Sequence, residues 1–291
     1  MVELNLRQVA CLLAVIDEGH FGRAAEKLFI SPPALTQQVR ALERKLGVEL
    51  IDRSMHPLRP TEIGTHFIPH ARQAVAAAER AVQATNEGGR LRIGFMTAAI
   101  GMQTGPLLDR VRREFLRSTL ELVELAWPDQ APAVRRGVVD AAIVRPPVAD
   151  DRGLRFDILY TEERVVALAS THPLATRTSV SIDDLDGEPH VSDTEADPDW
   201  VRWWACDPRP SGRPVTYGPS VRTIDELLEV VATGDAIAIT SQYVPDFHRH
   251  PGVTFVPVED LAPSPVCLCT RQDDTSKMAE ILRTFANQRR Q

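Results

Sequence analysis

The 291-residue sequence has few cysteines and no long apolar run. Its four cysteines are widely separated along the chain: Cys11, Cys206, Cys267 and Cys269. This spacing argues against the dense disulfide framework of a small secreted protein. No apolar segment approaches the ~18–20 residues that span a bilayer, and Glu3, Asn5 and Arg7 interrupt the stretch in which a signal peptide would be apolar. We therefore expect a cytoplasmic protein with no membrane partner.

The signatures of catalysis and of metal binding are also missing. The sequence has no glycine-rich phosphate loop, no nucleophile elbow and no metalloprotease helix. Cys267 and Cys269 share one face of an expected strand, but two thiols without an accompanying His or Cys cluster do not form a zinc site. We expect no enzymatic activity, no metal and no cofactor, and we expect the cysteines to be buried as small hydrophobic residues.

The charge of the chain is unevenly distributed. Hydrophobic residues make up 43% and charged residues 25%, which is ordinary for a globular protein, and the length suits two domains. The net charge is −7, but residues 1–90 carry 11 Lys and Arg against 10 Asp and Glu. Residues 91–291 carry the remaining 22 against 30, so the acidity belongs to the second part. A near-neutral first part can still present one basic face to a nucleic acid.

Three helices are expected near the N-terminus. The first has apolar residues at helical spacing before Gly19: Leu6, Val9, Leu12, Leu13 and Ile16. A second helix fits residues 22–28. Ser31 is a suitable N-cap for a third, with Pro32 in the first turn, where its missing N–H costs nothing. That helix should end between Leu46 and Gly47.

The third helix has two chemically different faces. At 100° per residue, its apolar side collects Leu35, Val39, Leu42 and Leu46. The opposite side collects Pro33, Thr36, Gln37, Arg40 and Arg44. One face is suited to a core and the other to reading a partner, although a solvated surface is the alternative for the two arginines.

A hairpin and a long helix should follow. Residues 49–60 are irregular, with a hairpin tip at 54–57, and Thr61 then caps a helix to about Glu87. Apolar residues recur along that helix at helical spacing: Ile63, Phe67, Ala71, Ala74, Val75, Ala78, Ala81 and Val82. We expect this stripe to lack a cover in its own domain and to pair with a second copy of the chain, with Gly88 and Gly89 as a joint.

After Arg90 short apolar strands alternate with helices. Strands are expected at 91–96, 120–125, 141–144, 165–169, 236–239 and 266–269, and helices at about 101–116, 129–138, 223–233 and 276–289. This alternation predicts an α/β fold with mostly parallel sheets and a ligand crevice beyond the strand ends. Three short helices followed by a hairpin fit a winged helix-turn-helix, whose third helix enters the major groove of DNA.

The residues of the first part resemble the DNA-binding signature of LysR-type transcriptional regulators. The resemblance is dense from Phe21 to Gly47 and continues through Leu50, Arg53 and Gly64. It is looser over 138–147, 172–175 and 231–238. The resemblance implies a winged helix-turn-helix over 1–60, a linker and dimerisation helix over 61–89, and a periplasmic-binding-protein-like effector domain over 90–291. Its two Rossmann-like subdomains would span about 91–160 with 266–291, and about 161–265.

The resemblance also implies partners and contact residues. The partners are double-stranded promoter or operator DNA, a second chain in a homodimer that usually assembles to a tetramer, a small effector, and RNA polymerase. The positions that match the recognition helix are Pro32, Pro33, Thr36, Gln37 and Arg40. From the wing, Arg53, His56 and Arg59 suit phosphate or the minor groove. The family usually has glutamine at the position of Pro32, so one base-reading side chain is missing.

For the effector, the matching positions are Thr97, Ala98, Trp127 and Arg145, and Thr223 begins a helix whose N-terminus should face the cleft. Arg145 suits a carboxylate, which favours a small anionic effector with a flat or apolar body. Two alternatives remain: Arg145 forms a surface ion pair with Asp150 or Asp151, and Trp127 only fills core space. For Trp200, Trp203 and Trp204 we favour core packing over a place in the cleft.

Two other functions are compatible with parts of the sequence. Residues 90–291 alone would suit a solute-binding protein of the transport type, but residues 1–87 and the lack of an export signal argue against it. A redox-sensing regulator that acts through cysteine is the second alternative, although Cys206 has no second thiol in its subdomain.

Overall fold

The computed structural model of the chain describes residues 4–85, 90–99 and 104–288. The chain divides into two compact units, Met1–Gly89 and Arg90–Gln291, and each is described by itself. Part of the helix expected at 101–116, the end of the linker helix at residues 86 and 87, the glycine joint and residue 289 lie outside the described residues.

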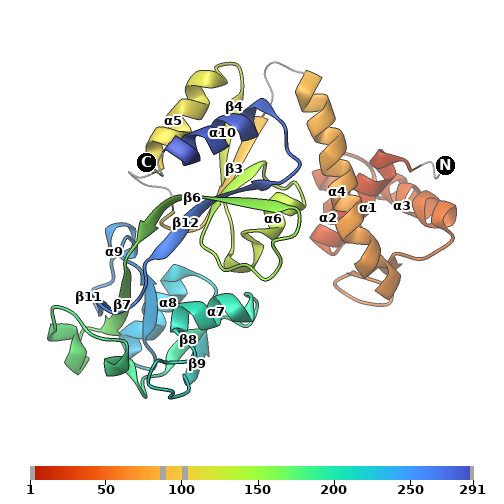
Figure 1. Cartoon of the computed structure of the whole chain (residues 1–291). Helices are drawn as coiled ribbons and strands as arrows, with labels where there is room; N and C mark the ends of the chain where they lie inside the picture. The colour runs from red at the N-terminus through yellow and green to blue at the C-terminus, as the bar shows by residue number, and fades with distance from the viewer. Residues whose placement is uncertain (1–3, 86–89, 100–103, 289–291) are drawn as a thin grey trace. The chain divides into compact units, whose positions relative to one another are not determined.

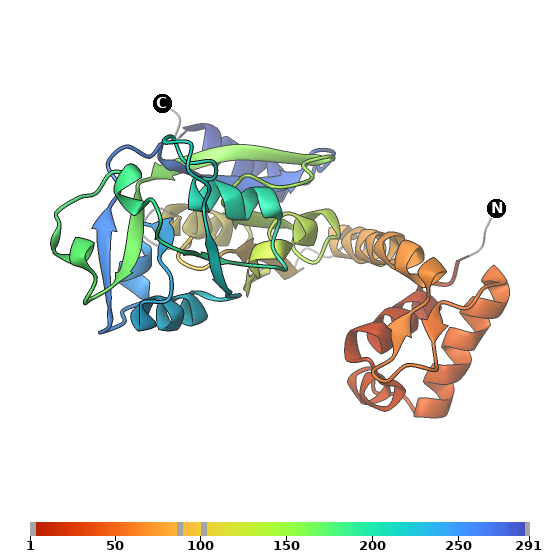
Figure 2. The same cartoon turned by 90° about the horizontal axis from the view of Figure 1, so that it is seen from below.

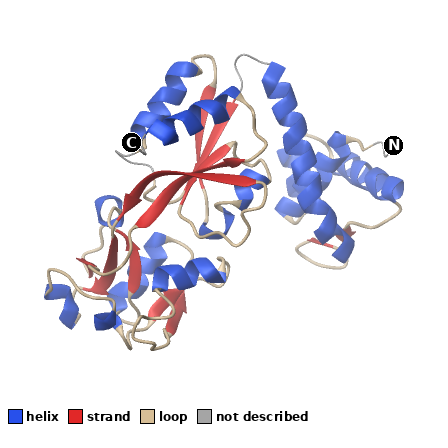
Figure 3. Ribbon diagram, viewed as in Figure 1, coloured by secondary structure: helices blue, strands red, loops and turns tan. Residues whose placement is uncertain are grey.

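The first unit is helical apart from one short hairpin (Figures 1 and 3). Its elements are α1 (Leu6–Glu18), α2 (Phe21–Lys27), α3 (Pro32–Leu46), β1 (Ile51–Asp52), β2 (Arg59–Pro60) and α4 (Glu62–Thr85). The predicted caps are confirmed: Ser31 Oγ accepts from the backbone N–H of Ala34, and Thr61 Oγ1 accepts from that of Gly64. Gly19 and Gly47 end α1 and α3 with φ angles of +60° and +70°, which suit glycine because it has no Cβ.

The first half of α4 packs on the core of its own unit, which corrects the expectation of an uncovered stripe. Ala71 is buried with Ile68 in the cluster formed by α1, α2 and α3, and Phe67 and Val75 pack against that cluster. An ion pair between Arg72 and Asp17 adds a polar contact to α1. The exposed members of the stripe lie near the two ends of the helix, Ile63 at 52% and Val82 at 61% of their surface.

The second unit begins with a five-stranded sheet in the order β4 (Thr119–Glu124), β3 (Arg90–Phe95), β5 (Ala141–Val144), β12 (Ser264–Arg271) and β6 (Leu154–Glu162). Only the pairs that β3 forms with β4 and β5 are parallel, whereas β12 runs antiparallel to both of its neighbours. β6 and β12 run side by side toward the second sheet (Figure 1).

The second sheet has the order β10 (Ala238–Ser241), β7 (Arg164–Ala169) and β11 (Val253–Pro257), and β7 is antiparallel to both partners. The expectation of mostly parallel sheets is therefore wrong for this unit. α8 (Ile224–Thr233) lies along one side of this sheet (Figure 2). A parallel pair, β8 (His190–Ser192) with β9 (Tyr217–Ser220), lies beside β10, to which His190 connects through a bridge at Ile237.

The remaining helices are α5 (Gly105–Glu114), α6 (Pro132–Arg135), α7 (Pro198–Ala205), α9 (Val244–Phe247) and α10 (Lys277–Gln288), with short 3-10 turns at Trp127–Asp129, Pro173–Thr176 and Asp183–Leu185. The single helix expected at 129–138 is instead a 3-10 turn and the four-residue α6. Pro132 starts α6, and Gly137, whose φ is +73°, follows its end.

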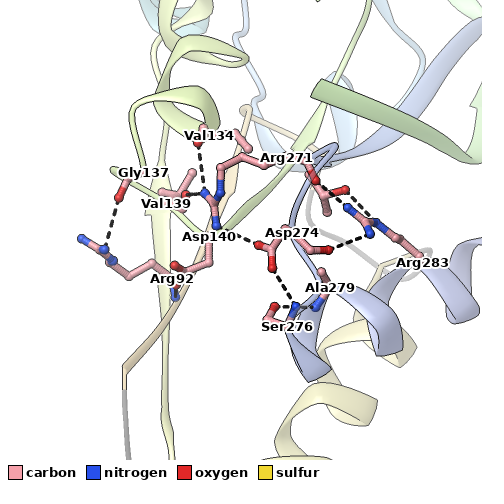
Figure 4. A network of polar contacts seen from close by, with 11 residues as sticks. Arg92, Val134, Gly137, Val139, Asp140, Arg271, Asp274, Ser276, Ala279 and Arg283 are labelled. Carbon is pink, nitrogen blue, oxygen red and sulfur yellow. Dashed lines mark hydrogen bonds and ion pairs between the residues drawn. The ribbon is translucent and has the colours of Figure 1, made fainter. Parts of the chain in front are cut away.

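A polar network fixes the C-terminal segment onto the first sheet (Figure 4). Arg271, at the end of β12, donates to the carbonyls of Val134 and Val139 and forms an ion pair of 2.8 Å with Asp274. Arg283 of α10 donates to the carbonyls of Asp274 and Arg271. Because these guanidinium groups bond backbone carbonyls across the sequence, α10 is anchored to β12 by more than apolar packing.

None of the described helices is both long and apolar enough to cross a membrane.

Candidate functional site

The exposed face of α3 is the first candidate site. Leu35, Val39 and Leu42 are fully buried in the core of the first unit. On the opposite side Pro32, Pro33, Gln37 and Arg40 are exposed, together with Arg44. Neither Arg40 nor Arg44 forms an ion pair with a described residue. The helix therefore presents hydrogen-bonding and cationic groups at no burial cost.

Thr36 lies at the edge of this face. It is half-buried, and its hydroxyl donates to the carbonyl of Pro32 at 2.9 Å, within the same helix. The hydroxyl oxygen keeps lone pairs for another donor.

Arg53 differs from the other cations of the hairpin. Its Nη2 lies 2.6 Å from Oε2 of Glu43, a carboxylate that is 6% exposed and also accepts from the N–H groups of Leu50 and Ile51. Sequence reasoning missed Glu43, whose only signal is an acidic residue beside the apolar face of α3. The contact holds the start of the hairpin against α3 and partly neutralises Arg53.

The tip of the hairpin is exposed. His56 and Arg59 face solvent, and the N–H of Leu58 donates to the carbonyl of Gly19 at 2.9 Å. At Gly19 a Cβ would lie 2.9 Å from that of Pro57, so the close approach of the hairpin to the end of α1 favours glycine there. The first unit thus holds the hairpin beside α1 and α3.

The second candidate site is a cavity of about 60 Å³ in the second unit. Its apolar walls are formed by Met96, Trp127, Trp200, Trp204, Ile224 and Leu227. Of the residues expected at the effector site, Thr97, Trp127 and Arg145 line this cavity. Ala98 and Thr223 are not among its lining residues; Thr223 is exposed, and its hydroxyl caps α8 by accepting from the N–H of Glu226.

Arg145 forms a buried ion pair inside the unit. Its Nε lies 2.5 Å from Oε1 of Glu162, and the two side chains are 4% and 0% exposed. Nη1 and Nη2 donate to the carbonyls of Thr97 and Ala98, and Nη2 also donates to Glu162. Four of the five N–H groups of this guanidinium have protein acceptors. Arg145 therefore holds the loop after β3, where Ala98 has a φ of +58°.

The alternative partners of Arg145, Asp150 and Asp151, are not the ones the structure gives it. Asp150 pairs with Arg135 and Arg152, and the hydrogen bond from Arg152 lowers the pKa of Asp150 to about 2. Glu162 takes this place because β12 lies between β5 and β6 and is antiparallel to both, so β5 and β6 run in the same direction and β6 continues past the end of β5, where Arg145 follows.

All four tryptophans of the chain form one aromatic cluster. The ring centroids of Trp127 and Trp200 are 5.5 Å apart, those of Trp200 and Trp204 are 6.0 Å apart, and those of Trp203 and Trp204 are 5.1 Å apart. The guanidinium of Arg164 lies 4.3 Å from the ring centroid of Trp203. The tryptophans pack in the core as expected, but Trp200 and Trp204 also line the cavity, so the preference for the core over the cleft was wrong for these two.

Sequence reasoning missed several polar residues of the cavity, among them His190 and Asp193. His190 Nε2 accepts from the N–H of Ile239 at 2.9 Å, so the ring proton is assigned to Nδ1, which lies 2.7 Å from the carbonyl of Val191. Burial lowers the pKa of His190 to about 4. The signal that could have found both is their place at β8, whose end meets the crevice, but that strand was not predicted.

Asp193 is 7% exposed. Its Oδ1 accepts from the N–H groups of Glu195 and Ala196, whereas Oδ2 is buried without a hydrogen-bond partner among the described residues. The indole Nε1 of Trp204 is likewise buried without a partner there, while that of Trp200 donates to the carbonyl of Arg145 at 3.1 Å. Unsatisfied buried groups of this kind mark a strained or ligand-binding position.

None of the four cysteines, all of which lie in the described residues, forms a disulfide, and Cys11, Cys267 and Cys269 are buried. Burial raises the pKa of the Cys269 thiol to about 12. Among the described residues, no group of three or more His, Cys, Asp or Glu side chains is arranged to hold a metal ion.

Comparisons with known proteins match both units. The family model described as "LysR substrate binding domain" matches residues 84–291, and that of "bacterial regulatory helix-turn-helix protein, lysR family" matches residues 6–65. The regulator TtuA of Agrobacterium vitis is 30% identical over 276 residues, which cover 88% of this chain and 86% of TtuA. AlsR of Bacillus subtilis is 31% identical over 194 residues, which cover 65% of this chain and 64% of AlsR, just under two-thirds.

Solved structures give the same fold. CbnR, a LysR family transcriptional regulator, has a TM-score of 0.72 at 19% identity, covering 99% of this chain and all of CbnR. The structure of full-length CbnR with its target DNA has a TM-score of 0.69. At such low identity the likeness concerns the fold.

Proposed function

Since this chain belongs to the LysR family of bacterial transcriptional regulators, we propose that it binds operator DNA and that a small effector controls this binding. The observation that carries the proposal is the division of α3, whose leucine and valine side is fully buried while Gln37 and Arg40 are exposed on the other side. Such a helix is built to enter the major groove. The complex of CbnR with its target DNA supports the same role for this chain.

In the proposed complex, Gln37 forms a bidentate pair with an adenine, and Thr36 contacts a thymine methyl or a phosphate. Arg40 reads guanine or binds phosphate, beside Pro32 and Pro33 at the start of the helix. Arg59 and His56 contact phosphate or the minor groove from the hairpin tip. Arg53 contributes less charge than these, since Glu43 already pairs with it.

We further propose that the chain acts as a homodimer that assembles to a tetramer. The exposed apolar surface of Ile63 and Val82 on α4, with the half-buried Ala74 and Ala78, supports this, because a second chain packed on such a helix removes apolar surface from water. Ala71, Phe67 and Val75 contribute indirectly, by seating α4 on its own core. Contact with RNA polymerase belongs to the same proposal.

The effector is assigned to the cavity of the second unit, at Thr97, Trp127 and Arg145. A ligand shifts DNA binding only through its different affinity for two arrangements of the assembly. In this function the chain performs no chemistry, which the regulator relatives support. It works in the cytoplasm, where its DNA is.

The test is binding to the DNA upstream of the chain's own gene, measured by fluorescence anisotropy at several salt concentrations. We expect sequence-selective binding that weakens steeply with salt, because cationic side chains release counterions. Gln37→Ala should cost about 1–3 kcal/mol of base discrimination, and Arg40→Ala should reduce the salt slope by about one. Gln73→Ala, the same change at an exposed site on α4, is the control.

Equal affinity for unrelated DNA, or no salt dependence, would contradict the regulator function. In that case the solute-binding alternative would explain the second unit better. A loss of binding on oxidation that disappears in a Cys206→Ser protein would instead support the redox alternative.

A further inference from the structure

Arg145, which lines the cavity, has little left to offer a ligand. Its side chain is 4% exposed, and four of its five N–H groups already donate to Glu162 or to the carbonyls of Thr97 and Ala98. Glu162 is 0% exposed, and its Oε1 lies 2.5 Å from Nε of Arg145. The protein's own carboxylate therefore occupies the place that an anionic ligand would take on this guanidinium.

The other basic side chain of the lining is His190, and it is neutral. Burial lowers its pKa to about 4, and its two ring nitrogens are hydrogen-bonded to the backbone at Val191 and Ile239. Among the described residues that line the cavity, no cation is thus free for a ligand. A carboxylate would lose its hydration there without gaining a counter-charge, which is costly in a buried site.

Asp193 is the acidic side chain of the lining. Its Oδ1 accepts from the N–H groups of Glu195 and Ala196, and its Oδ2 is shut off from solvent. The negative charge of Asp193 adds to the cost of a second anion nearby. A ligand cation would gain no direct contact with Oδ2, because that atom is closed even to water.

The uncharged part of the wall is largely apolar, with Trp127, Trp200 and Trp204 among its residues. Two hydroxyl groups of the lining already donate within the protein: Thr97 Oγ1 to Glu124 at 2.8 Å and Ser192 Oγ to the carbonyl of Gly218 at 3.2 Å. A molecule with an apolar part and no charge therefore loses the least on leaving water for this cavity.

We propose that this cavity binds a small uncharged molecule, and that Glu162 sets this preference by neutralising Arg145. The proposal rests on the proposed function, since it names the chemical class of the effector, and it replaces the anionic effector expected from Arg145. The volume of about 60 Å³ limits the ligand to a few heavy atoms, whereas an apolar cavity of about 150 Å³ holds benzene.

The first measurement compares three probes on the full-length protein. Acetamide, acetate and acetamidinium share one planar shape and are uncharged, negative and positive at neutral pH. All four tryptophans lie in the cluster at the cavity, so their fluorescence reports binding. So small a ligand cannot bind more tightly than about 0.04 mM, and titrations therefore extend to tens of millimolar at constant ionic strength. We expect acetamide to bind about tenfold or more tighter than either charged probe.

A second measurement tests the role of Glu162. Glu162→Gln keeps an oxygen that accepts from Nε of Arg145 but removes the negative charge. Acetate should then bind about tenfold or more tighter than it binds the wild-type chain, because the guanidinium lacks a counter-charge. Glu163→Gln removes the same charge from the exposed neighbouring position and should leave all three affinities unchanged.

Thermal melting keeps this test informative if Glu162→Gln is destabilised. Acetate should raise the melting temperature of this variant more than that of the wild-type chain, because a ligand that binds the folded state stabilises it. An equal shift in both proteins would contradict the role of Glu162.

A third measurement places the ligand in the cavity. Leu227→Phe enlarges a side chain of the lining and should weaken acetamide binding several-fold or more. Leu228→Phe makes the same change at the next position of α8, which is also buried but does not line the cavity. The folded Leu228 variant should keep the wild-type affinity.

The ligand class is refuted if acetamide gives no saturable response, or if acetate or acetamidinium binds the wild-type chain more tightly. The role of Glu162 is refuted if Glu162→Gln leaves both the affinity for acetate and the melting shift unchanged. DNA binding is measured separately on the same samples. Selective DNA binding without acetamide binding refutes the ligand class alone, whereas acetamide binding without selective DNA binding refutes the proposed function.

Discussion

The exposed face of α3 and the cavity at Asp193 offer polar groups to a partner in opposite ways. On α3, Gln37 and Arg40 are exposed, so they do not bury polar groups that would need a hydrogen-bond partner inside the protein. In the cavity most polar side chains have a protein partner, but two buried atoms, Asp193 Oδ2 and Trp204 Nε1, have none among the described residues. The comparison teaches that a surface site is identified by the exposed polar and charged side chains that it presents. A buried site is identified by the polar atoms that have no hydrogen-bond partner.

The two units also rely on different contacts for stability. The first unit packs leucines, valines and alanines, with close backbone approaches at Gly19 and Gly64, and its ion pairs keep at least one partner partly exposed, as in Arg53 with Glu43. The second buries a complete ion pair, Arg145 with Glu162, at its candidate site. Removing single groups should therefore affect the two units through different mechanisms.

The largest effect is expected at Glu162. Glu162→Ala leaves Arg145 buried without its carboxylate, which should destabilise the second unit by about 3–5 kcal/mol. Tryptophan fluorescence during urea unfolding measures this, because all four tryptophans belong to the second unit. Glu163→Ala, at the exposed neighbouring position, is the matched control. An equal loss of unfolding free energy in both variants would show that the buried ion pair does not contribute specially to the stability of the second unit.

A smaller effect is expected at Gly64 in the first unit. A Cβ at this position would lie 2.2 Å from the carbonyl oxygen of Leu50, which belongs to the backbone and cannot rotate away. Gly64→Ala should lower the free energy of unfolding of the first unit by about 3 kcal/mol through overpacking. The helical circular dichroism should then be lost at a lower temperature, and the DNA affinity should fall. Gly105→Ala, where a Cβ would meet no atom of the described residues within 4 Å, should be neutral or slightly stabilising. Unchanged stability of the Gly64 variant would refute the close approach.

The smallest effect is a dependence on pH in the second unit. The pKa of His190 is about 4 in the folded chain and 6.5 in the reference state, so the unfolded chain binds the extra proton between these values. The stabilising contribution is therefore complete above pH 6.5 and is lost as the pH falls toward 4. We expect about 2 kcal/mol to be lost from this group between pH 7.5 and 5.

The measurement for His190 is urea unfolding at several pH values, compared with His190→Gln. In the variant, the free energy of unfolding should fall less between pH 7.5 and 5, whatever its value at pH 7. Parallel curves for the two proteins would show that His190 is not the group responsible.

Local signals explain why the first unit was largely predictable. Ser31, Pro32, Gly47 and Thr61 specify helix ends through contacts within a few residues, and the 3.6-residue period specifies the buried face of α3. The cover of α4 was not predictable in this way, because Ala71 meets α1 only after more than fifty residues of intervening chain fold back.

The cavity was much less predictable, since its groups meet through long-range pairing. Glu162 reaches Arg145 because β12 pairs with both β5 and β6 in antiparallel orientation, which the spacing of apolar residues does not encode. Asp193 follows β8, a three-residue strand too short to give a periodic pattern. Thr97, Trp127 and Arg145 were located through the family resemblance, and their hydrogen-bond partners were not.

The seating of α4 on the first unit has a mechanical consequence. At 1.5 Å per residue its 24 residues extend about 36 Å, which makes the helix a lever as long as one turn of DNA. Because the first half of α4 is packed on its own unit, with Ala71 and Arg72 near the middle of the helix held against α1, the direction of α4 is tied to that of α3. Over this length, a rotation of about 5° displaces one end of the helix by about 3 Å relative to the other, which is close to one base-pair step of about 3.4 Å.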